Sequence, residues 1–291
     1  MLLYKQNKCL EGEYLVFRIS NNEPRYSLVI DGKEYQSTDF SAVWYMHPTL
    51  PKPLLAYEPA EHRSFIHAQF YEMRRALWTV MGDKTWLNDP WKAAEAESKI
   101  VQLATACRTG LKVPETVITS DPDRIRSFRV DCGGDIIVKN LGTSPILDHV
   151  IYTNKITDES MLSIDSVRSS PSIFQANVPK KYELRITIVG ETMFPVRIDS
   201  QEDALTAIDW RSKPKLNDFN VHMEPTMIPL DIERRLRAFM RSMGLTYGCV
   251  DMVVTPSDEY VFLEVNPNGQ WYFVQLRTGL VIADAIAGLL A

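Results

Sequence analysis

The sequence predicts an α+β fold, in which antiparallel hairpins and amphipathic helices follow one another along the chain. Hairpins are indicated where a strand-like segment turns through Asp31-Gly32, and again where two such segments flank Gly190-Glu191. Helices are indicated where apolar residues recur three and four positions apart, as in residues 60–81 and 232–243. A chain of 291 residues is long enough to form two or three packed units.

The first ninety residues are predicted to form several strands and then one long helix. Strands are expected over residues 14–19 and 42–45, and a hairpin over residues 26–35. The helix over residues 60–81 carries an apolar stripe, which we expect to lie in the core because such stripes face a packed interior. The stripe consists of Phe65, Ile66, Phe70, Met73, Leu77 and Val80. A domain boundary is expected near residues 86–90.

After this boundary, helices and strands alternate. Asp89 is expected to cap a helix that begins at Pro90 and continues to Gly110. An extended segment is predicted next, over residues 114–119. A helix is predicted from Asp121 onward, and a buried strand over residues 136–138. Residues 145–172 are weakly patterned and contain many Ser, Thr and Asp residues, so they are predicted to form a loop or lid with little regular structure.

The C-terminal third again has clear periodic signals. A hairpin is expected over residues 183–199, followed by a helix that ends at Gly244. Residues 248–255 and 260–266 are predicted to form a second hairpin joined by a four-residue turn. A final apolar helix is expected near residues 281–290.

Two acidic residues face each other in this second hairpin. If Thr255 pairs with Tyr260 across the turn, counting back places Asp251 opposite Glu264, with Cβ atoms roughly 5 Å apart. Asn266 lies on the same face as Glu264 because side chains alternate along a strand. Three oxygen ligands on one hairpin predict a magnesium site. The alternative is a pair of solvent-facing carboxylates, but the specialised polar turn over residues 267–271 favours the metal site.

Lys99 and Lys139 are the candidates for binding phosphate groups. A lone lysine is usually a surface charge, but Lys139 ends a strand and precedes a polar loop over residues 140–145. Together with the acidic hairpin, the two lysines predict nucleotide binding.

Composition excludes several other functions. The chain is 45% apolar and 24% charged, as soluble globular proteins are, and its net charge of −5 argues against nucleic acid as the main partner. Cys9, Cys107, Cys132 and Cys249 are scattered, which indicates neither a zinc site nor a disulfide framework. No segment has the length and apolarity of a signal peptide or a membrane span, so a cytoplasmic protein is expected.

The order of these parts resembles the ATP-grasp superfamily, whose two α+β subdomains hold ATP between them. The resemblance implies an N-terminal pre-ATP-grasp α/β domain over residues 1–90, a central subdomain over 91–175 and a C-terminal subdomain over 176–291. It also implies ATP and Mg²⁺ as cofactors. The implied nucleotide-binding residues are Lys99 and Lys139 for phosphates, Gln175, Asn177 and Val178 for adenine, Glu183 for ribose and Arg185 for phosphates. The implied metal ligands are Asp251, Glu264 and Asn266.

Several motifs further resemble the graspetide maturases, which are ATP-grasp ligases that close macrocycles in ribosomally made peptides. The motifs lie at residues 43–48, 86–90, 110–119, 209–211 and 264–271. The resemblance implies that Asp or Glu side chains of a precursor peptide, which has a leader and a core, are activated as acyl phosphates and joined to Ser, Thr or Lys side chains. It also implies a homodimer as a candidate assembly.

Three arginines are candidate catalytic residues: the first offsets phosphate charge, and the other two are candidates for contacting the reacting carboxylate, because arginine can hold a carboxylate bidentately. They are Arg185, Arg197 and Arg211, and the alternative for the last two is an exposed arginine on a strand or loop. Two other functions stay open at this point. One is a ligase that joins an amino acid to a peptide or small carboxylate, like glutamate ligases and glutathione synthetases. The other is a peptide-binding module without catalysis, against which the retained lysines and metal ligands argue.

Overall fold

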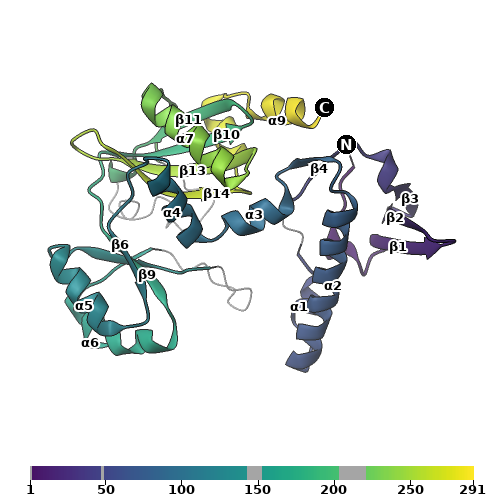
Figure 1. The fold of residues 1–291 in the computed structure, drawn as a ribbon, viewed down its shortest axis with the longest axis horizontal. Coiled ribbons are helices and arrows are strands. Elements are labelled where there is room, and N and C mark those ends of the chain that lie inside the picture. The colour runs from purple at the N-terminus through teal and green to yellow at the C-terminus, as the bar shows by residue number, and fades with distance from the viewer. Residues whose placement is uncertain (1, 47–48, 143–152, 203–220) are drawn as a thin grey trace. The chain divides into compact units, whose positions relative to one another are not determined.

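The computed structural model describes residues 2–46, 49–142, 153–202 and 221–291. They form an α+β fold that divides into two compact units, residues 1–91 with 286–291 and residues 92–285 (Figure 1). The division into three domains expected above stays a prediction. Among the described residues, no helix combines the length and the apolar character needed to cross a membrane.

The first unit contains two small sheets. Strands β1 (Tyr14–Ser20), β2 (Glu23–Ile30) and β3 (Lys33–Gln36) form an antiparallel sheet, and Asp31 and Gly32 both adopt a positive φ between β2 and β3. This arrangement confirms the first predicted hairpin. Strands β4 (Ala42–Trp44) and β5 (Thr85–Leu87) pair in parallel. The short helices of this unit are η1 (Gln6–Lys8), η2 (Ser37–Asp39) and α1 (Lys52–Leu55).

Helix α2 (Ala60–Val80) forms as predicted, but its apolar stripe does not lie in the core. Trp78 is the one residue of α2 that is buried, and it packs near the end of the helix with Met81 and Trp86. Phe65 is 64% exposed and Val80 is also exposed. The prediction of a core stripe was therefore wrong, because a periodic apolar stripe shows that a helix can bury one face but not which surface covers it.

The second unit begins with two helices in place of the predicted single one. Helix α3 (Pro90–Ala96) ends before Ser98, and α4 (Lys99–Arg108) begins directly after it. The Ser98 side chain caps α4 by accepting a hydrogen bond from the backbone N–H of Val101. Lys99 is consequently the first residue of α4.

A four-stranded sheet follows, with the order β6 (Thr116–Thr119), β9 (Ser172–Ala176), β7 (Ile136–Lys139) and β8 (Asn154–Lys155). Helix α5 (Pro122–Asp131), capped by Asp121 as predicted, buries Ile125 against Ile136 and Phe174 of this sheet. Residues 145–152 of the predicted lid lie outside the described residues. The rest of the lid contains more regular structure than predicted, namely α6 (Asp158–Leu162) and the 3-10 helix η3 (Ile164–Ser169).

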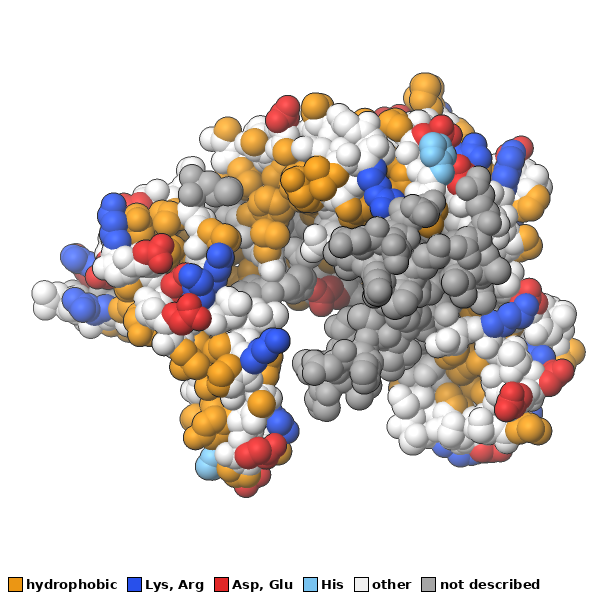
Figure 2. All heavy atoms as spheres, turned by 180° about the vertical axis from the view of Figure 1, so that it is seen from behind, with side chains coloured by type: hydrophobic (Ala, Val, Ile, Leu, Met, Phe, Trp, Pro, Cys, Tyr) orange, Lys and Arg blue, Asp and Glu red, His pale blue; other side chains and the backbone are white. Residues whose placement is uncertain are grey.

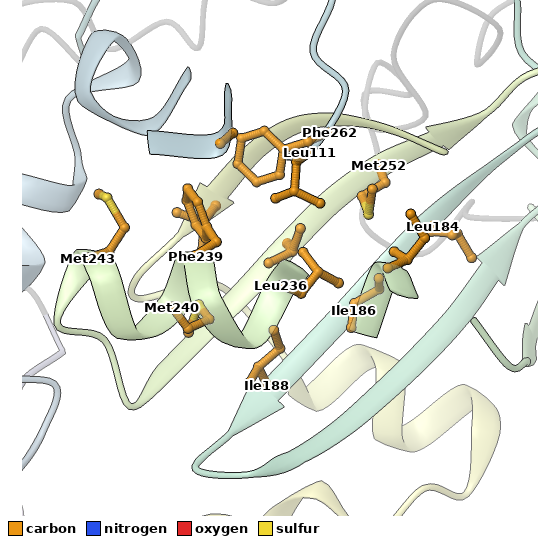
Figure 3. Packing of buried hydrophobic residues seen from close by; sticks show 14 of the residues in the cluster. Leu111, Leu184, Ile186, Ile188, Leu236, Phe239, Met240, Met243, Met252 and Phe262 are labelled. Atoms are coloured by element: carbon orange, nitrogen blue, oxygen red, sulfur yellow. The ribbon is translucent and has the colours of Figure 1, made fainter. Parts of the chain in front are cut away.

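The second sheet of this unit has five antiparallel strands, in the order β12 (Met223–Pro225), β11 (Thr192–Ile198), β10 (Tyr182–Val189), β13 (Tyr247–Val254) and β14 (Tyr260–Asn266). It confirms both hairpins predicted for the C-terminal third. Helix α7 (Leu230–Met243) lies against one face of the sheet and ends at Gly244, whose φ of 67° is left-handed (Figure 3). The remaining elements are η4 (Ser200–Glu202), α8 (Tyr272–Thr278) and α9 (Ile282–Leu290).

The two faces of this five-stranded sheet differ in chemistry. The face toward α7 is apolar, and Figure 3 shows Leu236 of α7 close to Ile186 and Phe239 of α7 close to Phe262. The other face carries the residues of β10 and β13 that alternate with the core residues, and they include Glu183, Arg185, Thr187, Tyr247, Cys249 and Asp251. Burial of one face therefore fixes which side chains project from the other.

We expect the helix–sheet core to dominate the stability of the second unit. Leu236 is fully buried, whereas Leu230 on the same helix is 72% exposed. Leu236→Ala is expected to lower the free energy of unfolding by about 2–5 kcal/mol, since it opens a cavity, and Leu230→Ala by less than about 0.5 kcal/mol. Urea denaturation followed by circular dichroism measures both, and equal losses would show that α7 does not anchor the core.

Candidate functional site

The hairpin of β13 and β14 brings Asp251 directly opposite Glu264, as predicted. The register at the turn is nevertheless one residue different from the expected one, because Tyr260 pairs with Val254 and not with Thr255. A β-bulge between Asp251 and Met252 corrects the difference, with Leu263 as the extra residue. Bulges of this kind occur next to active sites, where they redirect side chains.

Asn266 lies on the same face as the two acids. It is opposite Cys249, two residues before Asp251, and side chains two residues apart share a face. In the part of the chain that the structure describes, no three His, Cys, Asp or Glu side chains gather at one point, so a metal here requires the asparagine oxygen. Two carboxylates and an amide are the hard oxygen donors that Mg²⁺ prefers, and the donor set fits this ion.

Asp251 is held by Arg185 of the neighbouring strand β10. Nη1 of Arg185 donates to both carboxylate oxygens of Asp251, at 2.9 and 2.8 Å, and the two residues are 4% and 8% exposed. Burial lowers the pKa of Arg185, but the charge and hydrogen bonds of Asp251, together with other neighbouring groups, outweigh burial and leave the pKa of Arg185 raised. Nη2 of the same arginine donates to the backbone oxygen of Gln270, at 3.1 Å.

Glu264 forms an ion pair with Lys99, the first residue of α4. The helix is fixed to β14 by Gln102, whose side chain donates to the backbone oxygen of Val265 and accepts from its N–H, at 2.9 Å each. The Gln102 side chain thus makes the two hydrogen bonds to the backbone of Val265 that a neighbouring strand would otherwise make. The structure thereby brings Lys99 to the predicted metal site.

Glu183 projects from the same face of the sheet and is paired with Lys180, at 3.0 Å. Burial raises the pKa of Glu183, and Lys180 offsets only part of this effect. The sequence analysis did not identify Lys180. The sequence indicated it only by the position of Lys180 three residues before Glu183, because a buried acid requires a partner of opposite charge.

The segment expected to contact adenine follows β9. Gln175 is buried and donates to Thr116 Oγ1 at 3.0 Å, while its Oε1 accepts no hydrogen bond from the described residues. Asn177 is held by Asp135, whose backbone oxygen and carboxylate both accept from it, at 3.0 and 3.1 Å. Val178 follows and is half-buried. This segment connects the two sheets of the second unit.

Burial raises the pKa of the Asp135 carboxyl, but hydrogen bonds from Lys155 and Asn177 outweigh burial and leave that pKa lowered. Asp135 therefore stays ionised and keeps its contact with Asn177.

The remaining predicted residues are not all brought together. Lys139 is the last residue of β7 and is half-buried there. Arg197 pairs with Leu184 and so lies on the sheet face opposite to that of Arg185, where it donates to Asp199 and stacks over the ring of Tyr182. The structure therefore does not bring Arg197 to Arg185. Arg211 lies outside the described residues.

The comparisons with known proteins agree with this geometry. No protein-family model matches the chain, and no curated protein sequence matches it either. Among solved structures, the macrocyclase MdnC of Microcystis aeruginosa, bound with its precursor peptide MdnA, is similar with a TM-score of 0.84 and 28% identity, over 98% of this chain and 89% of that one.

A second similar structure is a RiPP-associated ATP-grasp ligase of Chryseobacterium gregarium in complex with ADP and a leader and core peptide. It has a TM-score of 0.81 and 27% identity, over 98% of this chain and 86% of that one. The ATP-grasp ligase PsnB, complexed with Mg and ADP, is similar in fold, with a TM-score of 0.70 and 18% identity over 95% of this chain and 86% of that one.

These matches identify the class of protein. The chain has the ATP-grasp fold, and over almost its whole length its structure is that of the ATP-grasp ligases that modify ribosomally made peptides. The resemblance that the sequence motifs indicated is confirmed.

We expect the buried pair of Arg185 and Asp251 to be essential for stability. Asp251→Asn leaves the Arg185 charge buried without a counter-charge and is expected to lower the free energy of unfolding by about 3–5 kcal/mol. The control is Glu259→Gln in the same hairpin, whose exposed pair with Lys112 contributes less than about 1 kcal/mol. Urea denaturation measures both losses. The double variant R185M/D251L is expected to recover much of the loss, and a fully stable Asp251→Asn protein would contradict this assignment.

Proposed function

We propose that the chain is an ATP-dependent ligase that activates Asp or Glu side chains of a ribosomally made precursor peptide and closes ester or amide macrocycles between side chains. The observation that carries the proposal is the acid pair Asp251 and Glu264, which lies in register beside Lys99. The structural match to macrocyclases over almost the whole chain supports the same reaction.

The residues of the sheet face are proposed to bind Mg²⁺ and ATP in defined places. Asp251, Glu264 and Asn266 would hold Mg²⁺, which would offset the negative charge of the ATP phosphates. Lys99 and Lys139 bind the phosphates, and Arg185 adds positive charge from beneath the site. The segment with Gln175, Asn177 and Val178 binds adenine, and Glu183 binds the ribose.

In the proposed reaction, a carboxylate oxygen of the peptide attacks the γ-phosphorus of ATP and ADP leaves. A Ser or Thr hydroxyl or a Lys amine then attacks the carbonyl carbon of the acyl phosphate, inorganic phosphate leaves and the nucleophile loses its proton. The chain contributes mainly positioning and positive charge, because phosphoryl transfer requires little covalent chemistry from side chains. Arg211 is proposed to contact the reacting carboxylate, whereas Arg197 has no part in this proposal.

The partner is proposed to be a precursor peptide with a leader and a core. The similar structure from Chryseobacterium gregarium is a complex with such a leader and core peptide. We further propose that the enzyme works in the cytoplasm, where ATP is available and where its free cysteines stay reduced.

A homodimer formed through the exposed face of α1 and α2 is also proposed. The large apolar side chains exposed on these helices and between them include Leu55, Tyr57, Phe65 and Tyr71. Figure 2 shows hydrophobic side chains along this pair of helices, at the lower left. Large exposed apolar patches of soluble proteins usually mark interaction surfaces, and Arg75 and Glu72 beside this face can pair with the opposite charges of a second copy.

The ligase reaction is tested by ADP release and intact mass with a precursor peptide. Glu264→Gln and Lys139→Ala are each expected to lower peptide-dependent ADP release roughly hundredfold or more, because the first weakens the proposed Mg²⁺ site and the second removes a positive charge from the phosphates. Glu259→Gln, in the same hairpin but outside the site, is expected to keep normal activity.

The product mass decides the type of ligase. Loss of one water per ring in a single peptide supports ring closure. A gain of an amino-acid residue mass supports an amino-acid ligase, and full activity of Glu264→Gln would refute the metal assignment.

The dimer is tested by light scattering after gel filtration. Phe65→Asp is expected to shift the wild-type dimer to a monomer, because it places a charge in the apolar contact. Val130→Asp is the control, since Val130 is even more exposed than Phe65 but lies on α5. A monomeric wild-type protein, or a Phe65→Asp dimer, would refute this interface.

A further inference from the structure

Residues 266–271 comprise the last residue of β14 and the turn that follows it, and side chains of the sheet hold this turn by hydrogen bonds. The N–H of Gly269 donates to the backbone oxygen of Asn266 at 3.0 Å and closes the turn. Three side chains of the sheet donate to backbone oxygens of the turn: Tyr247 Oη to Gly269, and both Arg185 Nη2 and Cys249 Sγ to Gln270. The strands β10 and β13 thus supply the hydrogen bonds for a segment outside the ladder.

Tyr247 is well suited to this contact. It is 2% exposed, and burial raises the pKa of its hydroxyl far above the usual range, so the hydroxyl remains a donor. The carbonyl of Gly269 has this donor in place of water. Removal of the hydroxyl alone is therefore expected to weaken the attachment of the turn without changing the shape of the core.

Position 269 requires glycine because there is no room for a side chain, and not because of its backbone conformation. The φ of Gly269 is not positive. A Cβ atom added at this position would lie 2.5 Å from the Cβ of Cys249 and 3.0 Å from Nη2 of Arg185. Cys249 is fully buried directly opposite Asn266. Any larger residue at position 269 therefore displaces either the turn or the arginine that holds Asp251.

We propose that Tyr247, Cys249 and Gly269 are positioning residues that fix the turn and thereby orient the side chain of Asn266. The inference rests on the proposed function, because it gives Asn266 its metal-binding role. Asn266 is the last residue of β14, and its own backbone oxygen accepts the bond that closes the turn. A change in the turn therefore acts directly on this residue.

The attachment of the turn is tested without nucleotide, metal or peptide. Amide hydrogen exchange, measured by mass spectrometry over residues 266–271 of the full chain, is expected to be faster in Tyr247→Phe than in the wild type. The control is Tyr26→Phe, which also removes a buried tyrosine hydrogen bond to a backbone oxygen, that of Met73, in the other unit. If the amides of residues 266–271 exchanged in Tyr247→Phe at the same rate as in the wild type, the inference would be overturned.

The effect on Asn266 is tested by Mn²⁺ binding in the presence of ADP, measured by electron paramagnetic resonance. Tyr247→Phe is expected to bind Mn²⁺ about tenfold more weakly, as is typical when groups that orient a metal ligand are removed. Tyr26→Phe is expected to bind normally. Unchanged Mn²⁺ binding in Tyr247→Phe would overturn the inference. Failure of the wild type to close rings in any peptide, with these binding results as expected, would instead refute the proposed function alone.

A double variant tests whether glycine is needed at position 269 because Cys249 lies so close. Gly269→Ala is expected to weaken Mn²⁺ binding about tenfold. Adding Cys249→Gly removes the Cβ atom that the new methyl group meets, and is expected to restore part of the affinity. Additive losses in C249G/G269A would overturn the role of this close contact.

Discussion

The buried ion pair of Arg185 and Asp251 connects two strands of the candidate site with the turn after β14. One guanidinium holds the acid of the neighbouring strand with Nη1 and the backbone of the turn after β14 with Nη2. A charge at this depth is strongly unfavourable without its partner, so neither residue can move alone. The positions of β10, β13 and the turn are therefore set by one interaction, and the proposed metal ligand Asp251 is held in place by it.

The alternation of side chains in the five-stranded sheet produces both the core and the site. The apolar residues of β10 and β13 pack under α7, and the residues between them project toward the opposite face. Helix α4 then adds Lys99 to that face, because Gln102 bonds to the backbone of β14. The site is thus assembled from rigid strands and a fixed helix start, which suits a reaction that depends on positioning.

Much of this arrangement could be predicted from the sequence, but some details depended on distant contacts. The opposition of Asp251 and Glu264 was predicted from a turn register that was wrong by one residue, and the bulge at Leu263 made the result correct. Bulges have weak local signals because they are stabilised by neighbouring strands. The exposure of Phe65 was missed for a related reason, since periodicity does not reveal what covers a helix face.

By itself the sequence determined the hairpins, the cap at Asp121, the end of α7 at Gly244 and the placement of Asp251, Glu264 and Asn266 on one face of a hairpin, because turns, caps and side-chain periods are encoded within a few residues. Only the tertiary structure decided that Arg197 lies on the opposite face from Arg185, that Lys180 pairs with Glu183 and that Tyr247 supports the turn at Gly269. These contacts depend on strand register, and register is fixed by packing across the whole sheet.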